Sequence, residues 1–329
     1  MNKESLTISQ IYAKGKENLK KMGVDLVNPP WPRIVPSVKV NRKYLDSLFF
    51  QPKFLNPPNV DTNLTVFGAK LRTPVFCSAI SKLPYMSETA IADIAKGIAS
   101  AGAFIMLGIG SSAELQSAID TGAPVVKIVK PYRKTELIYE KIRDAENRGC
   151  VAVGMDIDHF YGVLVVDKIV RTELFSPQHT SELKQLISQT KLPFIIKGVL
   201  STSDAEKAVE LGASAIVVSN HGSGAFAFSI PSMIALPKIA ESVGNKLPLL
   251  VDTGFETGND VFKALAFGAK ATGFATSMLL AWAADGSRGV GNLINQITAE
   301  LHRTMGATGC PNLSAINSSM IIEIPLARE

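Results

Sequence analysis

The chain has 329 residues, of which 46% are hydrophobic and 19% charged, with a formal net charge of +5 at pH 7. This composition predicts a globular chain with a large core, arranged as one large domain or two small ones. The basic residues are dispersed, without the stripe or module that nucleic-acid binding requires, so no nucleic-acid partner is expected. The densest basic cluster fits small anionic molecules better: Lys127, Lys130, Arg133 and Lys134.

Cysteine use and hydropathy indicate the compartment. Cys77, Cys150 and Cys310 are far apart and lack metal-ligand spacing, which predicts a reducing compartment without a disulfide framework. The N-terminus has no apolar signal core, and no run of about 18 apolar residues occurs. We therefore expect a cytoplasmic protein with no membrane partner.

The first 73 residues differ from the rest of the chain. A helical pattern covers Ser9 to Met22, a proline-rich break follows, and a second helix is expected over Asn41–Phe49. We interpret residues 1–73 as an N-terminal helical cap and entry segment, and residues 74–329 as the main body.

From Pro74 onward, strand and helix patterns alternate regularly. Short apolar runs bounded by turn residues predict buried strands, and eight strand–helix units in a row predict an α/β fold, the (β/α)8 TIM barrel. A doubly wound open sheet is the alternative, but no Gly-x-Gly-x-x-Gly motif follows the first strand. The expected strands are 74–78, 103–107, 125–129, 151–158, 194–198, 214–219, 248–252 and 271–275.

Two neighbouring strands are followed by polar residues. One apolar run ends at Lys197, and the next ends in Ser219-Asn220-His221. In a parallel barrel the carboxyl ends of the strands carry the chemistry. A single lysine past a strand would suggest the surface, but two consecutive strands with polar ends favour a site.

Four motifs occur in a characteristic order and spacing. They are Ile195-Ile-Lys-Gly-Val-Leu, then Ser219-Asn-His-Gly, then Leu250-Val-Asp252 with Asp260-Val-Phe-Lys-Ala-Leu-Ala-Phe-Gly268-Ala, and Met305-Gly-Ala-Thr-Gly309-Cys310. Together they closely resemble the FMN-dependent α-hydroxy-acid oxidase/dehydrogenase family, which includes glycolate and lactate oxidases. The resemblance implies FMN at the mouth of the barrel, a small-molecule substrate and a homo-oligomer, a tetramer in the family.

The resemblance also implies catalytic roles. It places the proton-accepting histidine on His221, the lysine near flavin N1 on Lys197, and the aspartate that orients the histidine on Asp158. Each role is chemically reasonable, because a neutral imidazole is a suitable base and a fixed ammonium stabilises negative charge on a reduced cofactor.

The implied cofactor contacts include two changes of charge. Lys127 replaces a glutamine of the family and Asp156 replaces a threonine. Inward-facing positions on neighbouring strands would let these two side chains form a salt bridge, and the alternative is a site remodelled for a different ligand. The implied cofactor-binding residues are Ser78, Ala79, Gly108, Lys127, Asp156, Lys197, Ser219, Asp252, Gly254, Thr257, Ala275 and Thr276.

The substrate-binding residues expected at the site depart from those of the family. Gly224 stands where an arginine clamps the substrate carboxylate, Arg171 aligns with no motif, and the family's tyrosines fall near Leu26 and Val129. A bidentate arginine contributes strongly to orientation, so an ordinary small α-hydroxy acid is not the expected substrate.

The phosphate site has changed as well. The family's Asp-Gly-Gly-x-Arg-Arg becomes Asp252-Thr-Gly-Phe-Glu256-Thr257, and its Gly-Arg becomes Ala275-Thr276. Backbone N–H groups after strands seven and eight still suit a phosphate, so weakened FMN binding is expected.

Other candidate residues receive structural interpretations. His159 is predicted to have a loop or cap role, His179 and His302 are predicted to be structural, and Cys77 is predicted to be a small buried residue. No metal site is expected, because Asp156 and its neighbours lack a further ligand cluster at helical spacing.

Three functional hypotheses remain open. The first is a divergent FMN-dependent oxidoreductase that acts on a hydroxy-acid-like or other CH–OH substrate. The second is flavin-free Schiff-base or enolate chemistry at Lys197, as in a lyase. The third is a non-catalytic homologue that binds a ligand.

Overall fold

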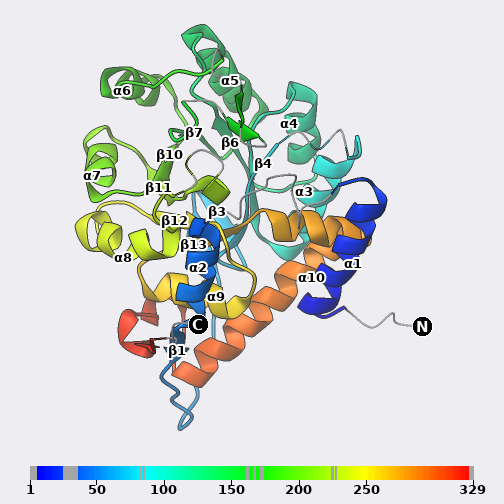
Figure 1. Cartoon of the computed structure of the whole chain (residues 1–329), viewed down its shortest axis with the longest axis vertical. Coiled ribbons are helices and arrows are strands. Elements are labelled where there is room, and N and C mark those ends of the chain that lie inside the picture. Colours follow the sequence, from blue (N-terminus) through cyan, green and yellow to red (C-terminus); the bar gives the residue numbers. More distant parts are fainter. Residues whose placement is uncertain are drawn as a thin grey trace.

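Eight short apolar segments form the parallel strands of a closed barrel, which confirms the predicted (β/α)8 fold (Figure 1). The structure is a computed structural model, and it describes residues 6–24, 36–81, 83, 86–160, 163–165, 168–170, 174–223, 226 and 228–325. Around the barrel the strands are β4 (Val75–Ile80), β5 (Phe104–Leu107), β6 (Val125–Val129), β7 (Ala152–Asp156), β10 (Phe194–Val199), β11 (Ala215–Val218), β12 (Leu249–Asp252) and β13 (Ala271–Phe274).

Alternate residues of each strand face either the barrel interior or the surrounding helices. The interior is filled by a separate apolar cluster, in which the rings of Phe76 and Phe104 stack with centroids 4.7 Å apart. Glycine at position 273 makes room for this packing, since a Cβ there would lie 2.6 Å from Phe76. Because the interior is packed, ligands have access only at the ends of the barrel.

Helices surround the barrel, and most of them come after one barrel strand and before the next in the sequence (Figure 1). Ser111 and Thr257 begin α4 and α9 with capping boxes, while Gly102 and Gly149 end α3 and α5 in the left-handed conformation. The helices are α3 (Ala90–Ala101), α4 (Ser112–Ile119), α5 (Thr135–Arg148), α6 (Thr180–Gln189), α7 (Thr202–Glu210), α8 (Ser232–Val243), α9 (Gly258–Ala266) and α10 (Thr276–Thr308), the last kinked at Asp285 and Gly286.

The N-terminal segment packs against the end of the chain. Helix α1 (Ile8–Lys21) lies along α10, and Gly15 allows this approach, because a Cβ there would collide with the Leu280 carbonyl. Helix α2 (Pro36–Asp46) ends earlier than predicted: Leu48–Phe50 forms strand β1, paired with β14 (Ile321–Glu323). Partners distant in sequence therefore turned the end of the predicted helix 41–49 into a strand.

Two further ribbons complete the described elements. Strands β2 (Leu64–Val66) and β3 (Ala69–Leu71) pair, and their apolar side chains join the interior cluster. Strands β8 (Val163–Val165) and β9 (Lys168–Val170) pair in the segment after β7. Three short 3-10 helices, η2 (His221–Ser223), η3 (Leu313–Ala315) and η4 (Ser318–Met320), occur in loops.

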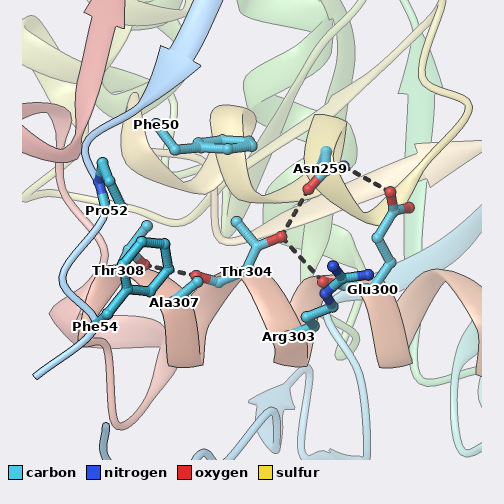
Figure 2. A pocket seen from close by; sticks show the side chains of 9 residues that line it. All are labelled: Phe50, Pro52, Phe54, Asn259, Glu300, Arg303, Thr304, Ala307 and Thr308. Carbon is cyan, nitrogen blue, oxygen red and sulfur yellow. Dashed lines mark hydrogen bonds between the residues drawn. The ribbon is translucent and has the colours of Figure 1, made fainter. Parts of the chain in front are cut away.

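A pocket lies between α9, the second half of α10 and the segment after β1 (Figure 2). Aromatic side chains form one wall, and a chain of hydrogen bonds joins Thr304, Asn259 and Glu300 on the other. The lining residues include none of those predicted to bind the cofactor or substrate: Phe50, Pro52, Phe54, Asn259, Glu300, Arg303, Thr304, Ala307 and Thr308. The candidate active site is therefore placed elsewhere, where titratable groups converge.

Candidate active site

Polar side chains from five strands meet at the carboxyl end of the barrel. They occupy the inward-facing positions that follow the packed interior, and all are buried. The structure thus brings together five of the residues predicted from the sequence, which we call the ring end of the site: Ser78, Asp156, Lys197, Ser219 and Asp252.

Lys197 lies at the centre of the ring end and is 1% exposed. Its Nζ lies 3.3 Å from Asp156 Oδ1 and 3.5 Å from Asp252 Oδ2, and donates to Ser219 Oγ at 3.1 Å. Burial alone would lower the pKa of this ammonium, but Asp252, Asp156 and Asp158 raise it above its usual range. Lys197 is therefore a fixed cation and a poor amine nucleophile.

Ser78 and Thr253 complete the environment of Asp252. The Ser78 hydroxyl donates to one carboxylate oxygen of Asp252, and the Thr253 hydroxyl donates to the other at 3.1 Å. The neighbouring Ala79 is half-buried against the interior cluster. Asp252 is thus held by two hydroxyl groups as well as by Lys197.

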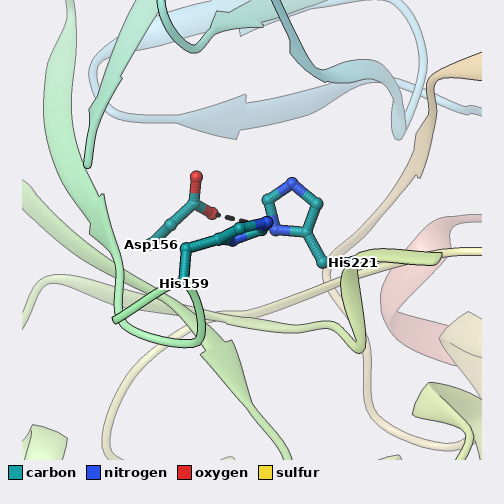
Figure 3. A group of neighbouring side chains, drawn as sticks. All are labelled: Asp156, His159 and His221. Carbon is teal, nitrogen blue, oxygen red and sulfur yellow. Dashed lines mark ion pairs between the residues drawn. The ribbon is translucent and has the colours of Figure 1, made fainter. Parts of the chain in front are cut away.

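His221 follows β11 and faces the mouth of the barrel. Its backbone has a φ of +53°, an uncommon conformation for a residue with a side chain, and its N–H donates to Ser219 Oγ at 3.1 Å. Its Nδ1 lies 3.3 Å from Asp158 Oδ2 and 3.5 Å from Asp156 Oδ1. The other ring nitrogen points away from this group (Figure 3).

The charge state of His221 suits a base. Burial, together with the nearby ammonium groups of Lys197 and Lys130, lowers the pKa of His221 to about 4, against the opposing influence of Asp156 and Asp158. The imidazole is therefore neutral at pH 7. Because Nδ1 faces a carboxylate, Nε2 carries the lone pair that can accept a proton.

Asp158 approaches the barrel closely because Gly198 has no side chain. Gly198 has a φ of +101°, and a Cβ there would lie 2.9 Å from Asp158 Cγ. Burial raises the pKa of Asp158, but the contact with His221 and hydrogen bonds from His159 and His221 hold it well below its usual range. The carboxylate thus stays ionised behind His221.

His159 lies in a turn after β7, in keeping with the loop position predicted for it, but its side chain also belongs to this site. Its side chain is buried, and its Nδ1 lies 2.9 Å from Asp158 Oδ1. The ring meets His221 edge to face, with centroids 4.0 Å apart. The sequence signal was its position directly after Asp158, which does not reveal that the chain turns back toward the barrel there.

The predicted pairing of Lys127 with Asp156 is wrong, because Lys127 points toward the helices. Its neighbours Val125 and Val129 pack in the outer layer, and its Nζ donates to the Gly108 carbonyl at 2.5 Å. Burial lowers the pKa of Lys127 to about 8. A direct contact of Lys127 with a ligand in the barrel mouth is therefore excluded by its orientation.

Lys130 makes the contact that was predicted for Lys127. It follows β6 in phase with the inward-facing Val126 and Ile128, and its Nζ donates to Asp156 Oδ2 at 2.6 Å. The ammonium groups of Lys197, on β10, and of Lys130, after β6, thus each contact one carboxylate oxygen of Asp156. With burial opposing them, Lys130 and Lys197 lower the pKa of Asp156 below its usual range.

The side chains of Asp156, His159 and His221 converge from two loops and one strand end (Figure 3). Their ligand atoms lie within 4.8 Å of one another, a spacing that a metal ion could bridge. However, the Nζ atoms of Lys130 and Lys197 lie 3.4 Å from the Nδ1 atoms of His159 and His221 and already neutralise Asp156. These ammonium groups disfavour a further cation, so the arrangement suits proton transfer.

A second group of predicted residues, which we call the phosphate end, lies after β12 and β13: Gly254, Thr257, Ala275 and Thr276. Gly254 has a φ of +78°, Thr257 is the N-cap of α9, and Ala275 and Thr276 begin α10. No hydrogen bond runs from the N–H groups of Gly254, Thr276 and Ser277 to another residue that the structure describes. These N–H groups and the start of α10 can receive an anion.

Other donors near the phosphate end are bound within the chain. The N–H groups of Glu256 and Thr257 both donate to Asp260 Oδ2, and Gly258 donates to Glu300. The guanidinium of Arg42 reaches this loop, but its two terminal nitrogens each donate to Asp260 at 2.9 Å. The ring end therefore fits a flavin ring, whereas among the described residues a phosphate would depend on backbone N–H groups, since the nearby Arg42 is bound to Asp260.

The remaining predictions have mixed outcomes. Cys77 is fully buried in the outer layer, and burial raises the pKa of its thiol, as expected for a small core residue. His179 is the N-cap of α6. Gly224, Arg171 and Leu26, which bear on the substrate clamp, lie outside the described residues.

Comparison with known proteins gives one family. The model of the FMN-dependent dehydrogenases matches residues 36–180 and 165–323. Glycolate oxidase 3 of Arabidopsis thaliana is 26% identical over 93% of each chain, and the spinach (Spinacia oleracea) glycolate oxidase is 24% identical over 97% of this chain and 96% of its own. A solved structure of a mandelate oxidase variant with an FMN adduct is 27% identical, with a TM-score of 0.80 over 88% of this chain and 92% of its own.

Proposed function

This chain belongs to the FMN-dependent dehydrogenase family, and we propose that it oxidises a CH–OH group of a small molecule with His221 as the proton acceptor. The observation that carries this proposal is the convergence of three groups. A neutral imidazole lies against the ionised Asp158, and the buried ammonium of Lys197 lies 3.4 Å from that imidazole. This combination places a proton acceptor beside a fixed positive charge, in a site whose floor is the packed interior of the barrel.

The oxidation removes a proton from the hydroxyl group and a hydride equivalent, one hydrogen with two electrons, from the substrate carbon. FMN, when bound, would supply the acceptor for that hydride equivalent. Nε2 of His221 removes the hydroxyl proton as the C–H bond breaks, so that the alcohol becomes a carbonyl. Asp158 stabilises the imidazolium that results, because its Oδ2 lies beside Nδ1.

The residues of the ring end would hold the cofactor ring. Lys197 can stabilise negative charge on the reduced ring, because it is buried and its ammonium is fixed by Asp156, Asp252 and Ser219. At the phosphate end, the N–H groups of Gly254 and Thr276 would bind the phosphate. FMN binding therefore depends mainly on the ring end.

The substrate proposal follows from the mouth of the barrel. The relatives named above are oxidases of glycolate and mandelate, and Gly224 here replaces the arginine that the resemblance implies for a carboxylate clamp. Beyond it, Phe226 and Phe228 are 67% and 75% exposed. We therefore propose a hydroxy-acid-like or other CH–OH compound with an apolar portion, rather than the smallest hydroxy acids.

The two other hypotheses make different predictions. Schiff-base chemistry needs a neutral Lys197 amine, and three carboxylates keep this side chain charged. A homologue without catalysis has no need for a neutral histidine backed by a carboxylate. Both observations support the oxidoreductase.

The test uses the purified full chain and added FMN. We expect the protein to bind FMN and the bound FMN to be reduced under anaerobic conditions by at least one member of a panel of 2-hydroxy acids, their amides and simple alcohols. The matched control is His221→Asn, which lacks Nε2 and should bind FMN without being reduced. Failure of the chain to bind FMN, or equal reduction in the variant, contradicts the proposal.

A cytoplasmic location and self-association are further proposals. All three cysteines are free and buried, which suits a reducing compartment, and no helix in the described part of the chain is long and apolar enough to span a membrane. Phe49 pairs with Ile322 across the β1–β14 ribbon, and both are nearly half exposed, as expected for a surface that binds another copy. Cell fractionation and the mass in solution test these two points.

A further inference from the structure

The carboxylate of Asp158 lies between two imidazole rings, one at each oxygen. Its Oδ2 lies 3.3 Å from Nδ1 of His221, and its Oδ1 lies 2.9 Å from Nδ1 of His159. We propose that His159 is a positioning residue, which holds Asp158 and thereby fixes the ring orientation and tautomer of His221. This inference rests on the proposed function only in taking His221 as the proton acceptor.

His159 is held more firmly than the ring that it positions. Its side chain is 5% exposed, whereas that of His221 is 24% exposed. The two rings pack edge to face, with centroids 4.0 Å apart, so the His159 ring occupies the space beside the His221 ring. A buried ring with both a hydrogen bond and this contact can therefore limit the rotation of the more exposed ring.

The shared carboxylate also decides where each proton lies. In a neutral imidazole, the nitrogen that faces an acceptor carries the hydrogen. Both Nδ1 atoms face Asp158, and Nδ1 of His221 also lies 3.5 Å from Asp156 Oδ1, so the carboxylates favour hydrogen on these Nδ1 atoms and leave the lone pair of His221 on Nε2. For His221 this is the tautomer that can receive a proton from a substrate. His159 occupies Oδ1, and this leaves Oδ2 directed toward His221.

Charged groups from three elements surround the pair of histidines. Asp156, at the end of β7, lies 3.5 Å from Nδ1 of His221, and Lys197, on β10, lies 3.4 Å from it. Lys130, which follows β6, lies 3.4 Å from Nδ1 of His159. The lysines oppose protonation of His221, and the carboxylates favour it. His159 donates a hydrogen bond to Asp158. This bond reduces the attraction of the Asp158 carboxylate for a protonated His221 and so helps to keep His221 neutral.

The test compares two variants of similar size. His159→Asn places an amide N–H where Nδ1 lies, and His159→Leu has a similar shape without a donor. Nitrogen-15 NMR of the histidine side chains reports both tautomer and titration, and the chain has only four histidines to assign. At pH 7, wild-type His159 and His221 should both carry hydrogen on Nδ1.

We expect His159→Leu to mix the tautomers of His221 and to raise the titration midpoint of His221 by about one pH unit. Without the hydrogen bond from His159, the carboxylate of Asp158 stabilises the protonated imidazole of His221 more strongly. His159→Asn should retain the wild-type tautomer and midpoint. A wild-type His221 with hydrogen on Nε2, or a folded His159→Leu variant with an unchanged His221, overturns the inference. If the leucine variant does not fold, an altered His221 in His159→Asn overturns it instead.

These spectra are recorded without FMN or substrate. They therefore separate this inference from the proposed function, whose failure would appear as absence of FMN binding or of FMN reduction. A merely structural role for His159 would change the thermal stability of the leucine variant and leave the tautomer of His221 as it is in the wild type.

Discussion

The ring end and the phosphate end of the site are built on opposite principles. At the ring end, buried charges from β7, β10 and β12 pair with one another and with nearby hydroxyls, and Lys197 lies within 3.5 Å of two carboxylates. At the phosphate end, the groups that remain for a ligand are backbone N–H groups, while Asp260 binds the guanidinium of Arg42. The ring end thus offers a ligand a network of buried charges, whereas the phosphate end offers backbone N–H groups near the start of α10.

The difference predicts how each end responds to change. Removing one member of a buried charge network leaves its partner unpaired, which is costly to the fold. At the phosphate end, the N–H groups of Gly254, Thr276 and Ser277 belong to no such network among the described residues, and Glu256 there is exposed. Substitutions at the ring end should therefore affect stability and chemistry together, whereas substitutions of Glu256 should affect cofactor affinity alone.

The largest effect is expected from Lys197→Met. This change leaves Asp252 and Asp156 with one fewer cation in a buried site, so the free energy of unfolding should fall by about 3 kcal/mol. FMN binding should also be lost. Urea denaturation measures the first and FMN titration the second. Lys246→Met, at an exposed lysine, is the matched control and should change neither, and a Lys197→Met protein as stable as wild type would contradict the network.

A large effect confined to chemistry is expected from His221→Asn. The variant loses Nε2, and with it the proton acceptor, so the rate of FMN reduction by a substrate should fall by about 10²–10⁴-fold. Rapid-mixing absorbance measures this rate. FMN affinity should change little, and a rate within about threefold of the wild type would show that another group takes the proton.

The pH dependence should reflect the low pKa of His221. A free imidazole loses its capacity as a base when pH falls below about 6.5. Here the pKa is lowered to about 4, so the group stays unprotonated, and kcat/KM stays high, as the pH falls through 6.5 toward 4. Activity should decline only near pH 4. A decline centred near pH 6.5 would mean that the imidazole is not shielded from protonation.

A smaller effect is expected at the phosphate end. Because the described residues offer a phosphate only backbone N–H groups, with Arg42 bound to Asp260, riboflavin should bind nearly as well as FMN, with dissociation constants within about tenfold. Glu256→Arg should strengthen FMN binding by about tenfold and leave riboflavin binding unchanged, since only FMN carries a phosphate. Quenching of flavin fluorescence measures both. Glu256→Gln, which adds no cation, is the control, and a strong wild-type preference for FMN would reveal phosphate ligands beyond these N–H groups.

The smallest effect is expected from Lys127→Met. Its ammonium contacts the Gly108 carbonyl in the outer layer and not the barrel mouth. FMN affinity should therefore stay within about twofold of the wild type, whereas Lys130→Met, which removes the buried partner of Asp156, should weaken it clearly. Equal effects of the two substitutions would contradict the orientation of β6.

The contrast between Lys127 and Lys130 shows where the sequence was insufficient. Apolar runs and the eightfold alternation predicted the barrel, because buried parallel strands are apolar on both faces. For the same reason, β6 carries valine or isoleucine on either side of Lys127, and alternation alone could not show which face was inward. The register pairs Lys127 with Leu107 and Val153, which pack in the outer layer, and the contact with Asp156 places Lys130 inside.

Other features that the sequence did not reveal depend on contacts between distant segments. His159 follows Asp158 directly, but its return toward His221 depends on a turn that no local pattern specifies. Residues Leu48–Phe50 continue a helical pattern and yet pair with the last strand. In contrast, Ser78, Asp156, Lys197, Ser219 and Asp252 could all be placed at the ends of their strands, since each follows an apolar run.

The most direct measurement of the central claim is an anaerobic titration of the FMN-loaded chain with the panel of hydroxy acids, amides and alcohols, followed by absorbance. If His221, Asp158 and Lys197 form a working site, at least one compound will reduce the bound FMN, and His221→Asn will slow this reduction by about 10²–10⁴-fold without releasing the cofactor. If the chain binds no FMN, or if its bound FMN is reduced equally well in the variant, the assignment of these residues is contradicted.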